Sequence, residues 1–76
     1  SLVVLTTRNV GNNHLKMRLK QEDSIPFDAI AFNCGETLGK KVRTGDRIAA
    51  VFTPRLNTWN GTTRVELEIR DLKLER

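Results

Sequence analysis

The sequence predicts an all-β domain of five strands, and two observations carry this prediction. Apolar and polar residues alternate along residues 15–20 and again along residues 65–70, which is the pattern of half-buried strands. Three further segments, residues 2–7, 26–33 and 47–56, are rich in apolar and β-branched residues. These five segments are therefore expected to be the strands of one sheet.

The connections between the first four strands have different characters. The first strand is expected to enter a turn near Asn12, because asparagine and glycine are frequent in this part of the chain. After the third strand, residues 34–45 lose strand character and are punctuated by three glycines. This connection is expected to hold at most one or two helical turns around residues 36–38.

The alternation assigns two faces to the third strand. Phe27 shares one face with Ala29 and Ala31, whereas Phe32 shares the other face with Ile30. One phenylalanine is therefore expected to be exposed, either as a platform for a nucleobase or as a surface covered by another part of a larger protein.

Strands four and five are expected to form a hairpin. Asn60 and Gly61 both tolerate a positive φ, so together they are a strong signal for a two-residue turn. Pro54 cannot donate a ladder hydrogen bond, which indicates an edge, a bulge or a bend in strand four. In strand five the apolar phase slips by one near Arg70 or Asp71, and a bulge would explain this slip.

Three strands, a short connection and then a hairpin is the element order of the OB-fold, and long curved strands with bulges favour a closed barrel. The sequence thus predicts a five-stranded OB-fold Greek-key barrel, with at most a short helical turn between strands three and four. Barrels of this kind bind oligonucleotides across strands two and three.

Length and composition limit the classes of function. A chain of 76 residues has room for one domain, expected over residues 1–76, and its net charge of +4 is moderately basic. Its longest apolar run is too short to span a membrane. The single Cys34 and the single His14 can form neither an internal disulfide nor a Cys/His metal cluster, so a reducing, cytoplasmic setting is expected. Without an initiating Met, the chain is expected to be a domain excised from a larger protein.

Catalysis by this chain has little support. One histidine, one cysteine and scattered carboxylates provide no nucleophile, base and orienting group together. Cys34 is expected to pack at the end of strand three rather than to react. Glu66 and Glu68 share one face of strand five, and we expect that face to be solvated and to balance neighbouring charges.

Positive charge is concentrated near the start of the chain. The first 21 residues contain Arg8, Lys16, Arg18 and Lys20 and no acid. If the alternation holds, Lys16, Arg18 and Lys20 project from the same solvent-facing side of strand two. Such a face could follow a phosphate backbone in the groove of an OB-fold. Lysines on strands also serve solubility and edge protection, so charge alone leaves both interpretations open.

Three other residues are candidate contacts to nucleic acid. Trp59 is expected in the loop between strands four and five, where it either stacks on a base or folds back over the open end of the barrel. His14 is expected in the loop between strands one and two, where it either touches a base or phosphate or packs within the turn. Arg55, on the predicted fourth strand, completes the candidate nucleic-acid-binding set.

Several short motifs follow one another along the chain: residues 14–19 (HLKMRL), 28–32 (DAIAF) with 35–36 (GE), 44–46 (TGD), 57–61 (NTWNG) and 65–67 (VEL) with 70–72 (RDL). Taken together and in this order, they resemble the OB-fold domain of the RecJ family of bacterial single-stranded-DNA-specific exonucleases. The resemblance covers residues 8–74, and its specificity lies in the ordered set rather than in any one motif.

The resemblance implies a cytoplasmic enzyme of DNA repair and recombination that degrades single strands from the 5′ end. It implies a two-metal phosphoesterase core with an Asp-His-His motif and Mn or Mg, and that motif is absent from this chain. This domain would then be non-catalytic and free of cofactors. Lys16, Arg18 and Lys20 would line the path of single-stranded DNA, with the Trp59 loop at its rim. The implied partners are single-stranded DNA, the catalytic domains of the parent chain and single-strand-binding protein, with no membrane.

Two other functions stay open on the sequence. A structural barrel could dock on the parent's catalytic domains or on a protein partner through Val3, Leu5 or Phe27. An RNA-binding OB module of the translation type shares the fold and the charge, and it would prefer RNA to DNA at equal salt.

Overall fold

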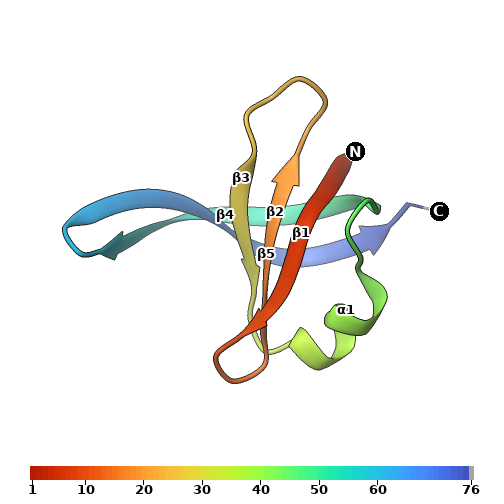
Figure 1. Cartoon of the computed structure of the whole chain (residues 1–76), viewed down its shortest axis with the longest axis horizontal. Helices are drawn as coiled ribbons and strands as arrows, with labels where there is room; N and C mark the ends of the chain where they lie inside the picture. The colour runs from red at the N-terminus through yellow and green to blue at the C-terminus, as the bar shows by residue number, and fades with distance from the viewer. Residues whose placement is uncertain (76) are drawn as a thin grey trace.

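A computed structural model describes residues 1–75, which form five strands and one short helix around a closed barrel (Figure 1). The elements are β1 (Leu2–Val10), β2 (His14–Lys20), β3 (Phe27–Ala31), α1 (Gly35–Lys41), β4 (Arg47–Trp59) and β5 (Thr62–Leu74). The strand order around the barrel is β1-β2-β3-β5-β4, with β3 and β5 parallel and the other neighbours antiparallel. The predicted five-stranded barrel is confirmed. Arg76, the last residue of the predicted domain, lies outside the described residues.

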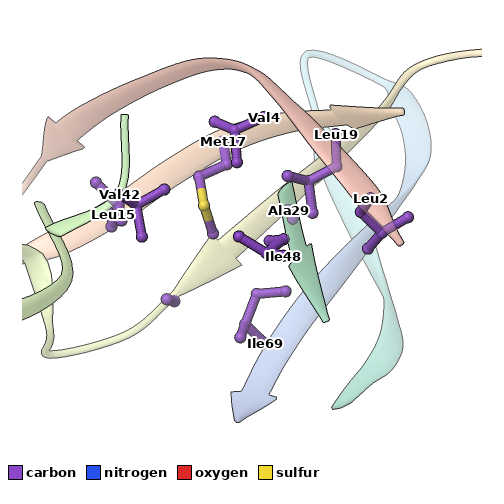
Figure 2. Close-up of a cluster of buried hydrophobic side chains, with 10 residues drawn as sticks. Leu2, Val4, Leu15, Met17, Leu19, Ala29, Val42, Ile48 and Ile69 are labelled. Carbon is purple, nitrogen blue, oxygen red and sulfur yellow. The ribbon is translucent and has the colours of Figure 1, made fainter. Parts of the chain in front are cut away.

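The core is made of the inward-facing residues of the alternating strands. Figure 2 shows Met17 from β2 pointing toward Ile48 from β4, with Leu15 from β2 beside Val42. Leu19 from β2 and Ile69 from β5 belong to the same buried cluster. Leu15, Leu19 and Ile48 are among the largest fully buried side chains. Burial of such a side chain contributes about 1.5–3 kcal/mol, so the period-two pattern of β2 supplies much of the force that closes the barrel.

The predicted bulge in strand five is present. Val51 pairs with Asp71, but the next residue, Phe52, pairs with Ile69, so Arg70 is left without a partner across the ladder. This extra residue shifts the phase of β5 by one, which is why Ile69 and Leu72 can both face the interior. Pro54 follows two residues later on β4. Beyond Ile48, β4 pairs only with β5, so Pro54 sits on an edge strand, which is one of the three places predicted for it.

The β4–β5 hairpin is longer than the sequence predicted. β4 was expected over residues 47–56, but the ladder continues to the pair Trp59↔Thr62. Asn60 (φ 49°) and Gly61 (φ 78°) form the predicted two-residue turn, which leaves no loop residues beside it. Residues 55–66, called the arm below, project from the barrel at the left of Figure 1. Within the arm the two strands pair only with each other.

The helix lies against the turn between β1 and β2. Asn13 accepts hydrogen bonds from the first turn of α1, through its carbonyl oxygen from the Gly35 amide (3.0 Å) and through Oδ1 from the Glu36 amide (2.6 Å). This contact leaves no room for a side chain at Gly35. A Cβ there would lie 2.6 Å from Asn9 Oδ1 and 3.1 Å from the Asn13 carbonyl carbon. Seven residues of helix agree with the one or two turns predicted for this connection, although the helix extends past residue 38.

We expect Gly35→Ala to destabilise the domain by about 1–3 kcal/mol, because an added methyl group at this contact forces the helix away from the β1–β2 turn. Urea unfolding followed by circular dichroism measures the change. Lys40→Ala, on the exposed side of the same helix, is the matched control and should change the unfolding free energy by less than about 0.5 kcal/mol. Equal stability of Gly35→Ala and the unsubstituted chain would contradict the packing described here.

Candidate nucleic-acid interface

The outer face of β1, β2 and β3 carries most of the predicted basic residues. Directly paired residues in neighbouring strands have side chains on the same side of the sheet. Lys16 pairs with Arg8 on one side and Ile30 on the other, and Arg18 pairs with Asp28. Lys20 lies on this same face, two residues further along β2.

The two faces of the arm differ in character. On the outer face, continuous with the basic face of the barrel, the arm carries Arg55, Asn57 and Trp59 from β4, paired with Glu66, Arg64 and Thr62 from β5. On the opposite face, Leu56 pairs with Val65, and their exposed fractions are 71% and 59%. The arm is therefore an amphipathic two-stranded ribbon with a polar side and an apolar side.

A depression of about 650 Å³ lies between the outer face of the barrel and the arm. We call it the groove. Its lining residues are Arg8, Lys16 and Asp28 from the barrel and Asn57, Trp59, Asn60, Thr62, Arg64, Val65 and Glu66 from the arm. A second hollow of about 410 Å³ shares the three barrel residues and extends the depression to Thr6 and Arg18.

Glu66 connects the arm to the barrel. Lys16 Nζ lies 3.1 Å from Glu66 Oε2, and the Glu66 side chain is only 6% exposed. The expectation that Glu66 faces solvent is wrong. It was based on the polar alternation of β5, which gives the face of a residue but not what covers that face. Here Lys16 of β2 lies against it, and the buried carboxylate gains a cation in place of water.

Two other ion pairs on this surface are more exposed than the Lys16–Glu66 pair. Arg18 Nε lies 3.8 Å from Asp28 Oδ1, and both side chains are about half exposed, at 52% and 43%. Arg70 lies 3.2 Å from Glu68 on β5 and also donates to the Thr53 hydroxyl. Exposed pairs of this kind contribute little to stability, typically below about 1 kcal/mol. Within residues 1–75, Arg8 and Arg64 make no ion pair.

Phe32 is the exposed phenylalanine that the alternation required, whereas Phe27 packs against the core. The His14 ring meets the Phe32 ring edge-on, with 5.1 Å between the ring centroids. The Cζ atom of Arg55 lies over the Phe32 ring, 5.0 Å from its centroid. His14 is the first residue of β2, so its predicted place in a loop is wrong. Its Nδ1 accepts a hydrogen bond from the Asn33 amide (3.1 Å), which fixes the ring at the start of the strand. Arg55 thus forms a second contact between the arm and the barrel.

Trp59 ends β4 and is 74% exposed at the tip of the arm, on the side that lines the groove. Its predicted place in a loop is wrong, because the two-residue turn allows the ladder to include it. The alternative in which the ring covers the open end of the barrel is also excluded by this exposure. An indole in this position can stack on a planar ligand without any rearrangement of the fold.

Cys34, Val3 and Leu5, three other residues considered from the sequence, do not line the groove. Cys34 is half-buried beside the core, and this desolvation raises the pKa of its thiol, which makes it a poorer nucleophile. Val3 and Leu5 are half-buried rather than freely exposed, so they offer less apolar surface to a partner than the sequence suggests. Among residues 1–75, no cluster of His, Cys, Asp and Glu could hold a metal ion, and no helix is long and apolar enough to cross a membrane.

Together, the barrel order, the helix between β3 and β4, and the groove beside the β4–β5 hairpin define an OB-fold domain. The sequence matches the family described as the RecJ OB domain over residues 1–71, and the chain belongs to this family. It is 35% identical over 71 residues to the single-stranded-DNA-specific exonuclease RecJ of Bacillus subtilis (strain 168). That match covers 91% of this chain and 9% of the relative, so the chain spans about a tenth of the relative's length. No solved structure matches the chain.

We expect Lys16→Met to destabilise the domain by about 2 kcal/mol, because it leaves the Glu66 carboxylate buried without a cation. This is less than for a fully buried pair, since the Lys16 side chain is 32% exposed. A double-mutant cycle with Glu66→Gln, measured by urea unfolding, should give a coupling free energy of about 1 kcal/mol or more. Arg18→Met is the control. It breaks the looser pair with Asp28 and should cost less than about 1 kcal/mol. Equal losses of stability in Lys16→Met and Arg18→Met would contradict the assignment of Lys16 as the partner of a buried Glu66 carboxylate.

Proposed function

We propose that this domain binds single-stranded DNA in the groove, without sequence preference, as an accessory domain of a RecJ-like exonuclease. The observation that carries the proposal is the exposed Trp59 beside the basic residues that line the same groove. Proteins that hold single strands combine a basic path for the backbone with aromatic side chains on which bases stack. The groove offers both, with Trp59 as the aromatic side chain and Arg8, Lys16 and Arg64 as the basic residues.

The proposed parent is a cytoplasmic 5′-to-3′ exonuclease of DNA repair and recombination. The name of the Bacillus subtilis relative supports a single-strand-specific nuclease, and most of that protein lies outside the matched part. Catalysis, with Mn or Mg, would belong to other domains of such a parent. The role of this domain would be to hold the substrate strand and direct it toward those domains, which together with single-strand-binding protein are its proposed partners.

Titration of the 76-residue chain with labelled single-stranded DNA tests the proposal. We expect anisotropy to show binding that weakens as salt rises, with a log–log slope of about 0.7 for each phosphate contacted. Duplex DNA of the same sequence should bind more weakly, and Trp59, the only tryptophan, should be quenched by the single strand. Trp59→Ala should reduce affinity by about 1–3 kcal/mol with little change in slope. No binding at low salt would refute the function, and tighter binding of matched RNA would favour the RNA-binding alternative.

The apolar face of the arm supports a second candidate, a barrel that docks on the parent's catalytic domains or on a protein partner. Leu56 and Val65 are directly paired and largely exposed, unlike the Val3, Leu5 and Phe27 surfaces that the sequence suggested. Leu56→Ser with Val65→Ser should then weaken binding of the 76-residue chain to the separately produced catalytic part of the parent. Ile25→Ser, at an 85% exposed apolar residue outside the arm, is the control and should leave that binding unchanged. Leu56→Ser alone and Ile25→Ser should leave DNA binding by the isolated chain unchanged, because neither residue lines the groove.

A further inference from the structure

We infer that Arg8 and Arg64 contact the phosphates of the bound strand, whereas Lys16 is a positioning residue that holds the arm through Glu66. This inference rests on the proposed function and assigns roles within the same groove. It differs from the expectation drawn from sequence, in which the Lys16, Arg18 and Lys20 side of β2 follows the backbone. The reasons are the ion pairs that Lys16 and Arg18 make in the folded chain and the position of Lys20, which lines neither of the two hollows described above.

The positive charge of Lys16 is already neutralised. Its ammonium group lies 3.1 Å from the Glu66 carboxylate, which is almost completely buried. A phosphate that took Lys16 from Glu66 would leave a buried carboxylate without a partner, which is strongly destabilising. A phosphate that joined the pair without breaking it would bring a second anion close to Glu66. Either arrangement makes Lys16 a poor site for the backbone.

Arg18 is less firmly paired than Lys16. Its partner Asp28 is 3.8 Å away and half exposed, so this pair is easily separated by a competing anion. The Asp28 carboxylate nevertheless stays at the groove, which it lines together with Lys16 and Glu66. The acids Asp28 and Glu66 offset the cations Lys16 and Arg18, so these four residues together carry no net charge.

Arg8 and Arg64 are in the opposite situation. Both are exposed, both line the groove, and within residues 1–75 neither makes an ion pair. Arg8 lies on β1 beyond Lys16, and Arg64 lies on the arm across the ladder from Asn57, so one stands on each side of the depression. A guanidinium group binds phosphate through two parallel hydrogen bonds, and no buried carboxylate is left unpaired when it does so.

The uncharged lining residues fit the bases. Trp59 offers a stacking surface, and Asn57, Asn60 and Thr62 offer amide and hydroxyl groups that can donate to or accept from base edges. Phosphates held at the exposed Arg8 and Arg64 would turn the bases toward these residues and toward the Lys16–Glu66 pair. Only a strand with unpaired bases can adopt this arrangement, so the pairing of charges favours single strands over duplex.

Salt titrations of substituted chains test this assignment. Arg8→Gln with Arg64→Gln should lower the slope of log affinity against log salt for single-stranded DNA by about 1.4, the value for two lost phosphate contacts. Lys40→Gln with Arg43→Gln is the matched control. These two residues line a separate hollow near α1 that shares no residue with the groove, so the same loss of charge there should leave the slope nearly unchanged.

Paired substitutions at Lys16 and Glu66 separate positioning from phosphate contact. Lys16→Gln with Glu66→Gln keeps the net charge, and we expect it to reduce Trp59 quenching and affinity while the salt slope stays that of the unsubstituted chain. Lys16→Arg, which can keep the ion pair, should retain both quenching and slope. Circular dichroism checks that each variant is folded.

The possible results are distinguishable. A slope lowered by the Lys16 and Glu66 double variant but not by the Arg8 and Arg64 double variant would overturn the inference and leave the proposed function intact. An equal reduction by the Lys40 and Arg43 control would also overturn it, because net charge alone would then explain the effect. Absence of salt-dependent binding by the unsubstituted chain would instead refute the proposed function itself.

Discussion

The rest of the structure depends on the continuous ladder between β4 and β5. Its inner half closes the barrel, where Ile48 and Ile69 enter the core, and its outer half forms the arm. Because side chains alternate along both strands, the face that lies inside the barrel becomes the exposed Leu56–Val65 face of the arm, and the outside of the barrel becomes the groove-lining face. The bulge at Arg70 shifts the alternation of β5 by one residue. Apolar side chains therefore face the interior on both sides of the bulge, at Ile69 and at Leu72.

A projecting two-stranded ribbon is only marginally stable by itself, so the arm needs contacts with the barrel to keep one orientation. The structure provides two. The Lys16–Glu66 pair joins β2 to β5, and the Arg55 guanidinium over the Phe32 ring joins β4 to the end of β3. Both contacts use groups that sequence analysis would assign to ligand binding, namely a cation on the basic face and an exposed aromatic. Their structural use changes which residues remain available to a ligand.

Much of the fold could be predicted because it follows from local rules. Alternation identified the strands and the face of Phe32, the slip near Arg70 identified the bulge, and Asn60-Gly61 identified the turn. The candidate site was harder to predict because its properties depend on contacts between distant segments. Glu66 was expected in solvent, since its place in the pattern says nothing about Lys16, fifty positions earlier, approaching it. No local signal sets the length of a β-ladder that continues beyond the barrel, so the sequence alone puts Trp59 in a loop.

The opposite faces of the arm also explain how one small domain could both hold DNA and belong to a larger enzyme. A partner centred on Leu56 would cover the apolar side of the arm and would reach the groove only at Val65, because the polar side chains of the ribbon point the other way. Such a contact would also restrict the motion of the arm, so that less conformational entropy is lost when a strand binds beside Trp59. Binding at one face would then strengthen binding at the other through the rigidity of the ribbon alone, with no change in the groove residues. The two proposed roles are therefore compatible, and the two-stranded ribbon is the element that would couple them.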